Sequence, residues 1–171
     1  TVVWEPIAAI AVGTAVALLV FVNELASAQG EVNVNDSEHN LIGRKNIMNL
    51  RNVGADGSTI VYRFAGQLMY INAQAHKAAI EQFGDNILLI VFSLRNLFYM
   101  DADGAQTFAE IIDVLHEQGK TVALAGVNEI VLPRLERTQW YHDLVEDGLV
   151  FDTTSDALHE LKHVNSVEHE S

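Results

Sequence analysis

Two histidines one helical turn apart near the end of the chain have the spacing of a metal site. His159 and His163 occur in the pattern His-Glu-x-x-His, with Glu160 between them. On a helix this spacing puts both imidazoles on one face, where they can chelate zinc while the glutamate acts as a base. His169 follows where a third ligand can stand. The chemistry of such a site is zinc-dependent hydrolysis.

The position of this motif argues against catalysis. It lies on the last predicted helix, about residues 155–163, and only eight residues follow it, too few to build a substrate cleft. Ala157, Leu158 and Leu161 have the spacing of a helix face that packs on a core. We therefore expect no enzyme, no catalytic metal and no cofactor, and we treat metal binding by the tail as adventitious.

The composition excludes several other chemistries. The 171 residues contain no Cys, which rules out disulfides, thiolate metal sites and thiol nucleophiles. A net charge of −13 argues against nucleic acid as a partner, because phosphate binding needs clustered Lys and Arg. We expect three histidines to be solvated and two aromatic residues to anchor packing: His76, His116 and His142, and Trp140 and Tyr141.

A short acidic loop is the better candidate for a functional site. Asp101 and Asp103 come just before Gly104 and a predicted helix, where either carboxylate can cap unpaired backbone N–H groups. Capping alone, with the preceding side chains covering the end of a sheet, is the simpler interpretation. The alternative is a contact surface for a partner, made by Phe98, Tyr99, Met100, Asp101, Ala102, Asp103 and Gly104.

An apolar segment at residues 1–22 begins the chain. Glu5 is its only charged residue, and residues 7–22 are an unbroken run of apolar and small side chains. As a helix, residues 2–22 extend about 30 Å, which matches a bilayer core. We expect a transmembrane helix; the alternatives are a buried helix of a soluble protein and a signal peptide with a cleavage-like stretch at 26–28. Because the first residue is Thr, we expect a piece of a longer product.

The rest of the chain divides into two parts. Residues 23–58 are polar with weak periodicity, which indicates a linker. In residues 59–171, strand-like runs alternate with helical periods, which predicts an α/β fold with a parallel or mixed central sheet. The predicted strands cover about residues 59–64, 86–94, 121–125 and 149–151, and the predicted helices about 73–83, 105–118, 129–138, 141–145 and 155–163.

Three segments of the second part resemble the STAS domain family. Residues 62–73, Tyr-Arg-Phe-Ala-Gly-Gln-Leu-Met-Tyr-Ile-Asn-Ala, resemble its opening strand and turn, and residues 99–104 resemble its Asp-Ser-Ser-Gly signature loop. Residues 124–127 and 135–137 are similar to its fourth strand and the helix that follows. The resemblance implies a mixed sheet of about four or five strands with about four or five helices.

The signature loop departs from the family's switchable pattern. In the antagonists of this family, the Ser just before the Gly is phosphorylated. Asp103 stands in that place here, after Ala102, and neither side chain has a hydroxyl group. A fixed carboxylate carries less charge than phosphoserine. We expect no phosphorylation control at this loop.

The order of segments suggests a function through the resemblance. STAS domains occur in anti-sigma-factor antagonists and in SulP-type transporters, where the domain follows the last membrane helix. The resemblance implies the C-terminal regulatory and structural domain of a secondary transporter for sulfate or bicarbonate, in the cell membrane with residues 23–171 cytoplasmic. Its partners would be its own membrane domain, a second copy in a homodimer and a cytoplasmic protein. The alternative is an antagonist-like signalling module without a phosphorylation switch.

Overall fold

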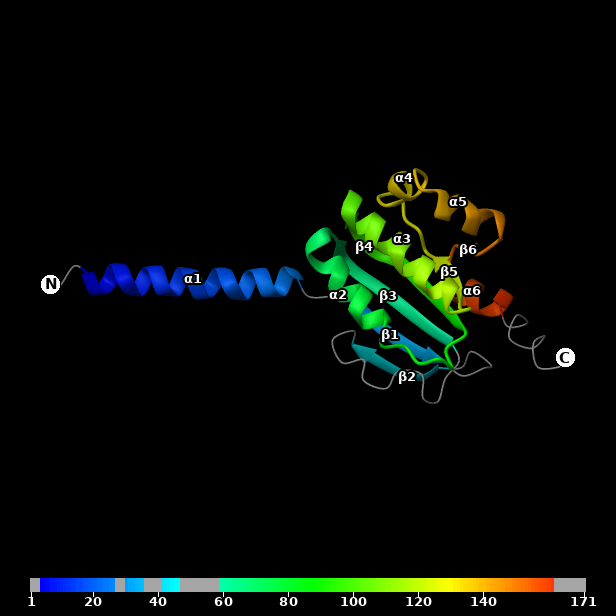
Figure 1. Cartoon of the computed structure of the whole chain (residues 1–171), viewed down its shortest axis with the longest axis horizontal. Helices are drawn as coiled ribbons and strands as arrows, with labels where there is room; N and C mark the ends of the chain where they lie inside the picture. Colours follow the sequence, from blue (N-terminus) through cyan, green and yellow to red (C-terminus); the bar gives the residue numbers. More distant parts are fainter. Residues whose placement is uncertain (1–3, 27–29, 36–40, 47–58, 162–171) are drawn as a thin grey trace.

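The fold consists of one apolar helix that projects from a six-stranded α/β unit (Figure 1). The computed structural model describes residues 4–26, 30–35, 41–46 and 59–161. Its elements in chain order are α1 (Trp4–Ala26), β1 (Gly30–Asn35), β2 (Leu41–Asn46), β3 (Thr59–Leu68), α2 (Tyr70–Ile80), β4 (Leu89–Met100), α3 (Ala102–Glu117), β5 (Thr121–Ala125), α4 (Leu132–Leu135), α5 (Gln139–Glu146), β6 (Val150–Phe151) and α6 (Thr154–Glu160).

The helix α1 extends away from the sheet and confirms the predicted apolar helix (Figure 1). Its stretch Pro6–Glu24 has a mean hydropathy of 2.2, and none of it is buried. In length and composition it is able to cross a membrane. Within the described part of the chain, α1 is therefore not buried in the core of the α/β unit. Only residues 27–29 separate α1 from β1.

The sheet has the strand order β2-β1-β3-β4-β5-β6. The four strands from β3 to β6 are parallel to one another, and β1 is antiparallel to both β2 and β3. The predicted α/β fold with a mixed sheet is thus confirmed, with more strands than expected.

The two additional strands lie in the segment that the sequence indicated to be a linker. β1 pairs along its whole length with Thr59–Phe64 of β3, and β2 pairs with β1, so residues 30–35 and 41–46 belong to the sheet. The expectation of a structureless tether is wrong there. In the sequence Val32 and Val34 alternate with Asn33 and Asn35, a period of two that is typical of a strand, but the segment is short and mostly polar. Residues 47–58 lie outside the described residues.

The central strands are buried on both faces, and alternate residues enter two cores. Tyr62, Phe92 and Leu124 point to the larger core, which is covered by α2, α3, α4 and α5. Val61 and Val91 point to the opposite face, which packs against α6. The crossover helices share one face because the parallel strands follow each other in sequence and right-handed crossovers then return on the same side.

One predicted helix is much shorter than expected. The pattern predicted helix over residues 129–138, but α4 has only four residues. The side chain of Asn128 accepts hydrogen bonds from the backbone N–H groups of Ile130 (3.0 Å) and Val131 (3.2 Å), which makes a turn before Pro133. Proline is tolerated in the first helical turn, and α4 begins there.

Candidate functional site

The candidate loop lies at the carboxyl end of β4, where the chain enters α3. Phe98 and Tyr99 are about half exposed, at 54% and 46%, while Met100 is buried. Ala102 and Asp103 are exposed on the first turn of α3. The structure therefore exposes two aromatic side chains and the carboxylate of Asp103.

Asp101, not Asp103, is the residue that caps α3. Its Oδ1 accepts a hydrogen bond from the backbone N–H of Gly104 at 2.6 Å, and its Oδ2 accepts one from the N–H of Tyr70 at 3.3 Å. The second bond reaches the first residue of α2. One carboxylate thus compensates the unpaired N–H groups and the positive dipole ends of two neighbouring helices. The exposed carboxylate of Asp103 does not cap α3 and is accessible to a binding partner.

Gly104 is required by the close approach of α3 to β3. A Cβ on this residue would overlap the carbonyl oxygen of Leu68 and lie 2.9 Å from its carbonyl carbon. The same carbonyl oxygen accepts a hydrogen bond from the N–H of Asp101 at 3.2 Å. The first turn of α3 is therefore pressed onto the end of β3, which fixes the direction of the loop.

The turn between β3 and α2 is held by one buried amide side chain. Oδ1 of Asn72 accepts a hydrogen bond from the N–H of Met69 at 2.8 Å, and its Nδ2 donates one to the carbonyl of Gln67 at 2.7 Å. This turn lies beside the β4–α3 loop through the bond between Asp101 and Tyr70. The site is consequently a rigid platform made by two adjacent turns.

Asn128 joins the far side of this platform to the end of β4. Its Nδ2 donates to the carbonyls of Leu94 (3.1 Å) and Leu97 (2.7 Å), while its Oδ1 binds the turn before α4. The sequence predicted no role for Asn128. A single Asn after the glycine that ends a strand was the only available sign.

Two clefts flank the candidate loop on the side of α4 and α5. The larger has a volume of about 410 Å³, and the smaller has about 210 Å³. Arg134 and Arg137 line both of them. The larger is otherwise lined by Ala102, Ala105, Gln106, Ala109, Thr138, Gln139 and Trp140, and the smaller by Tyr99, Met100, Ile130 and Pro133.

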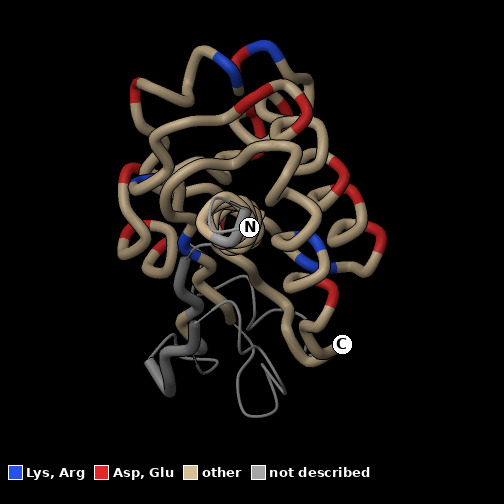
Figure 2. The backbone as a smooth tube through the Cα atoms, turned by 90° about the vertical axis from the view of Figure 1, so that its left-hand side faces the viewer, with Lys and Arg blue, Asp and Glu red and all other residues tan. Residues whose placement is uncertain are grey.

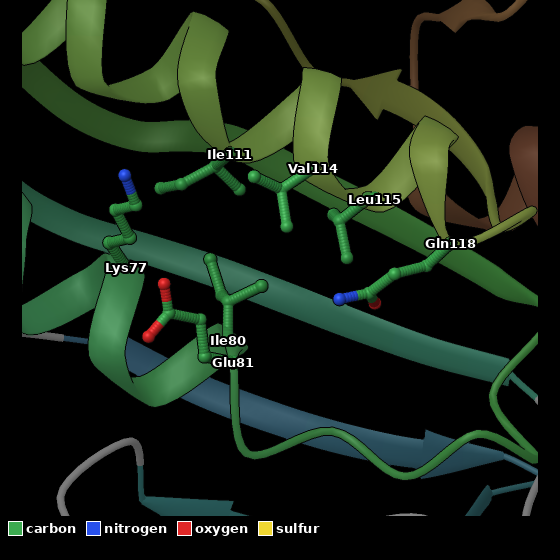
Figure 3. A pocket seen from close by; sticks show the side chains of 7 residues that line it. All are labelled: Lys77, Ile80, Glu81, Ile111, Val114, Leu115 and Gln118. Atoms are coloured by element: carbon green, nitrogen blue, oxygen red, sulfur yellow. The ribbon is translucent and has the colours of Figure 1, made fainter.

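A third hollow between α2 and α3 is too small for a ligand (Figure 3). Ile80, Ile111 and Leu115 form its apolar floor, and polar side chains such as Lys77 and Gln118 stand around it. Its volume of about 10 Å³ is that of a single water molecule. Lys77 is held at the rim by Glu110 at 3.1 Å.

His76 is buried, and the expectation that it is solvated is wrong. Its exposed fraction is 0%, and its Nδ1 lies 2.7 Å from the hydroxyl of Tyr62. Its Nε2 has no hydrogen-bond partner among the described residues. Burial lowers the pKa of His76 to about 4, because a charged imidazole would be desolvated there. Neighbouring aromatic rings enclose the pair, so it is part of the core.

The remaining sequence candidates divide between surface and core. His116 and His142 are exposed, as expected. Tyr141 is buried and Trp140 packs edge-on against Phe108 with ring centroids 5.4 Å apart, which confirms the predicted packing anchor.

The His-Glu-x-x-His motif does not form a described metal site. His159 and Glu160 are exposed at the end of α6, whereas His163 and His169 lie outside the described residues. No group of three potential ligands occurs within the part of the chain that the structure describes. Ala157 and Leu161 are buried, as their spacing predicted.

A sequence profile of one protein family, described as the STAS domain, matches residues 51–157. The match spans more than half of the chain and includes both turns of the platform. The comparison with curated proteins gives no match.

Solved structures share this fold at low sequence identity. A sulfate transporter family protein from Wolinella succinogenes has a TM-score of 0.55 and 20% identity, over 63% of this chain and 87% of that one. The murine solute carrier 26 family member A9 anion transporter has a TM-score of 0.61 and 15% identity, over 87% of this chain and 24% of that one. A protein described as an anti-sigma factor antagonist, from Thermotoga maritima, has a TM-score of 0.52 and 22% identity, over 61% of this chain and 88% of that one.

Proposed function

Since this chain belongs to the STAS domain family, we propose that it is the C-terminal part of a SulP-type secondary transporter for inorganic anions. In this proposal α1 is the last membrane helix and the sheet with its helices is a cytoplasmic domain. Sulfate and bicarbonate are the proposed cargo class. The proposed location is the cell membrane.

One observation carries the proposal: the apolar helix and the sheet form one continuous unit. α1 has the length and hydropathy of a membrane span, and β1 follows after three residues. The likeness to the murine transporter covers 87% of the chain. Such a match has to include residues before 59, because residues 59–171 are only about two thirds of the sequence. The likenesses to the Wolinella and Thermotoga proteins cover 63% and 61%.

The fragment's own role is regulatory and structural in this proposal. Its candidate contact surface is the loop Phe98–Gly104, where the exposed rings of Phe98 and Tyr99 stand on a rigid base. The occupants would be the membrane domain of the same protein, a second copy or a cytoplasmic protein. No transport site and no catalytic step is assigned to residues of this chain.

An antagonist-like signalling module is the second candidate. The fold of the Thermotoga protein supports it. Ala102 and Asp103 count against the usual phosphorylation switch, because neither provides a hydroxyl group at the exposed start of α3.

The size and location of the native protein distinguish the two candidates. An antibody raised against residues 86–171 is used to blot membrane and soluble fractions under denaturing conditions. We expect a membrane band much larger than the 18.8 kDa of this chain. A soluble band near that mass would overturn the transporter proposal and favour the signalling module.

A further inference from the structure

Exposed apolar side chains of the α/β unit gather at one end of its sheet. Among the described residues outside α1, seven large apolar side chains are exposed. Five of them lie where the strands β3, β4 and β5 end: Tyr70, Ile71, Phe98, Tyr99 and Ile130. These three strands are parallel, so their carboxyl ends are on the same side of the sheet. We call the five residues the apolar end.

The turns that carry these side chains adjoin one another. The N–H of Tyr70 donates to the carboxylate of Asp101, directly after β4, at 3.3 Å. Tyr99 and Ile130 together line the smaller cleft. The apolar end is therefore one continuous surface made by three neighbouring turns. A gathered set of exposed apolar side chains marks an interaction surface, whereas single ones are common on any protein.

The helix α1 leaves the domain on the same side. β1 is antiparallel to β3, and its first residue, Gly30, pairs with Phe64. β3 continues from Phe64 to Leu68, about 13 Å farther toward the side of α1. Only residues 27–29 connect α1 to β1, and α1 is in contact with α2, whose first residue is Tyr70. The apolar end consequently stands beside the end of α1 (Figure 1).

This position brings the apolar end to a bilayer surface when α1 is a membrane span. The apolar stretch of α1 ends at Glu24, close to the last residue of the helix. The headgroup region therefore begins where the apolar end stands. Two of its five residues are tyrosines, which combine an apolar ring with a polar hydroxyl group. Such side chains are enriched at the interface between membrane and water.

The charges on this side do not oppose contact with a membrane. Figure 2 looks along α1 onto this end of the domain, and most acidic positions lie around the margin of the view, away from α1. Arg95 is exposed near the end of β4, and the two arginines of the smaller cleft lie close by. Asp103 and Glu129 are exposed carboxylates at the same end. Charges of both signs are thus present, which leaves apolar contact as the main attraction.

We propose that the apolar end contacts the headgroup region of the lipid bilayer that α1 crosses. The rings of Tyr70, Phe98 and Tyr99 enter this region, and the two isoleucines add apolar area. Lipids without net charge are sufficient, because the contact is apolar. This inference rests on the part of the proposed function that makes α1 a membrane span, and not on transport. The contact fixes which end of the domain faces the membrane.

Spin labels at single cysteines test the proposal in the full chain. The sequence contains no Cys, so each cysteine variant carries one nitroxide. Tyr70→Cys and Phe98→Cys report on the apolar end in phosphatidylcholine nanodiscs. Leu88→Cys is the matched control, since Leu88 is exposed just before the other end of β4, about 33 Å away along the strand. Val16→Cys, within α1, is the reference for lipid.

Collisions with oxygen, which is concentrated in lipid, are compared with collisions with a water-soluble nickel chelate. We expect the labels at residues 70 and 98 to favour oxygen, as at residue 16, and the label at residue 88 to favour nickel. A water-like label at residue 98 with a lipid-like label at residue 16 would overturn this inference alone. Water-like labels at both would overturn the membrane span as well. Dipolar broadening between labels at residue 98 would show that a second copy covers the surface instead.

Loss of the rings should release the contact. In the chain labelled at residue 70, Phe98→Ser combined with Tyr99→Ser should shift the ratio of oxygen to nickel collisions toward that of residue 88. Leu88→Ser should leave this ratio unchanged. The substituted side chains are exposed, so the fold tolerates their loss. An unchanged ratio in the double variant would overturn the proposal, as would lipid contact that arises only when anionic lipid is added.

Discussion

The carboxylate of Asp101 accepts a hydrogen bond from the backbone N–H of Tyr70 at 3.3 Å, across two loops that are 31 positions apart in the sequence. The same carboxylate caps α3 through Gly104. Two crossover helices therefore share one capping group. The orientation of α2 relative to α3 depends on a residue that belongs to neither helix.

Loss of this shared cap should destabilise the fold more than loss of an ordinary cap. We expect Asp101→Ala to lower the free energy of unfolding by about 1–2 kcal/mol, the upper part of the usual range, because two helix ends lose an acceptor. Denaturant unfolding of the detergent-solubilised chain measures it, with Trp4→Phe as the background so that Trp140 is the fluorescent reporter. A change within about 0.5 kcal/mol of zero would show that water replaces the carboxylate at both sites.

The neighbouring carboxylate provides the matched comparison. Asp103 is exposed and accepts no hydrogen bond in the described structure. Asp103→Ser should leave the fold intact, with a change of about 1 kcal/mol or less in the same unfolding measurement. A loss of several kcal/mol would contradict the assignment of the cap to Asp101.

Gly104→Ala should be disruptive although alanine favours helices. The new methyl group would overlap the carbonyl oxygen of Leu68, which is backbone and cannot rotate away. We expect a loss of about 2 kcal/mol or more in the free energy of unfolding. Gly13→Ala is the control, since nothing lies within 4 Å of a Cβ there. Equal stability of both variants would mean that α3 shifts outward without cost.

The buried imidazole should make stability depend on pH below neutrality. The pKa of His76 is about 4 in the folded chain against an ordinary value of 6.5. Between these values the unfolded chain binds the proton and the folded chain does not. The free energy of unfolding should therefore fall as the pH drops from 6.5 to 4, by up to about 3 kcal/mol from this residue.

Two variants isolate that dependence. His76→Phe should flatten the slope of stability against pH across this window, whereas Tyr62→Phe should keep it, because the histidine is still buried. Urea unfolding at several pH values measures both slopes. An unchanged slope in His76→Phe would assign the dependence to other groups.

Lys120 is a buried cation whose partners are backbone groups. Its Nζ donates to the carbonyls of Gly84 and Ile87, each at 3.0 Å, and burial lowers the pKa of the amine. Lys120→Met keeps the length of the side chain but leaves both carbonyls without this donor. We expect a loss of about 1–3 kcal/mol on thermal or chemical unfolding. An unaffected variant would show that water enters the loop between α2 and β4.

The sequence predicted best those elements whose pattern is independent of distant segments. The range predicted for β5, residues 121–125, coincides with the structure, because a short apolar run stands between Gly119 and Gly126. The apolar stripe of α3 likewise identified the helix and its core face. Both patterns arise because the apolar side chains of each element are buried in the core. They can be recognised without knowing which segment packs against the element.

What the sequence could not predict depends on tertiary pairing. β1 is polar and forms a strand because the edge of β3 offers a ladder for its backbone. His76 occupies a position that a helical pattern assigns to the surface, but the fold closes over it. Asp101 could be identified as the capping residue only once the position of α2 was known. The larger cleft likewise exists only because α4 and α5 pack near α3.

The short connection between α1 and β1 has a mechanical consequence. The Cα atoms of Ala26 and Gly30 are at most about 14 Å apart, so there is little slack. β1 lies inside the sheet and is bonded on both edges, and its first residue is the one nearest α1 (Figure 1). Its ladder bonds run across the strand. A pull on α1 would therefore load both ladders in shear, with every bond sharing the force instead of opening one after another.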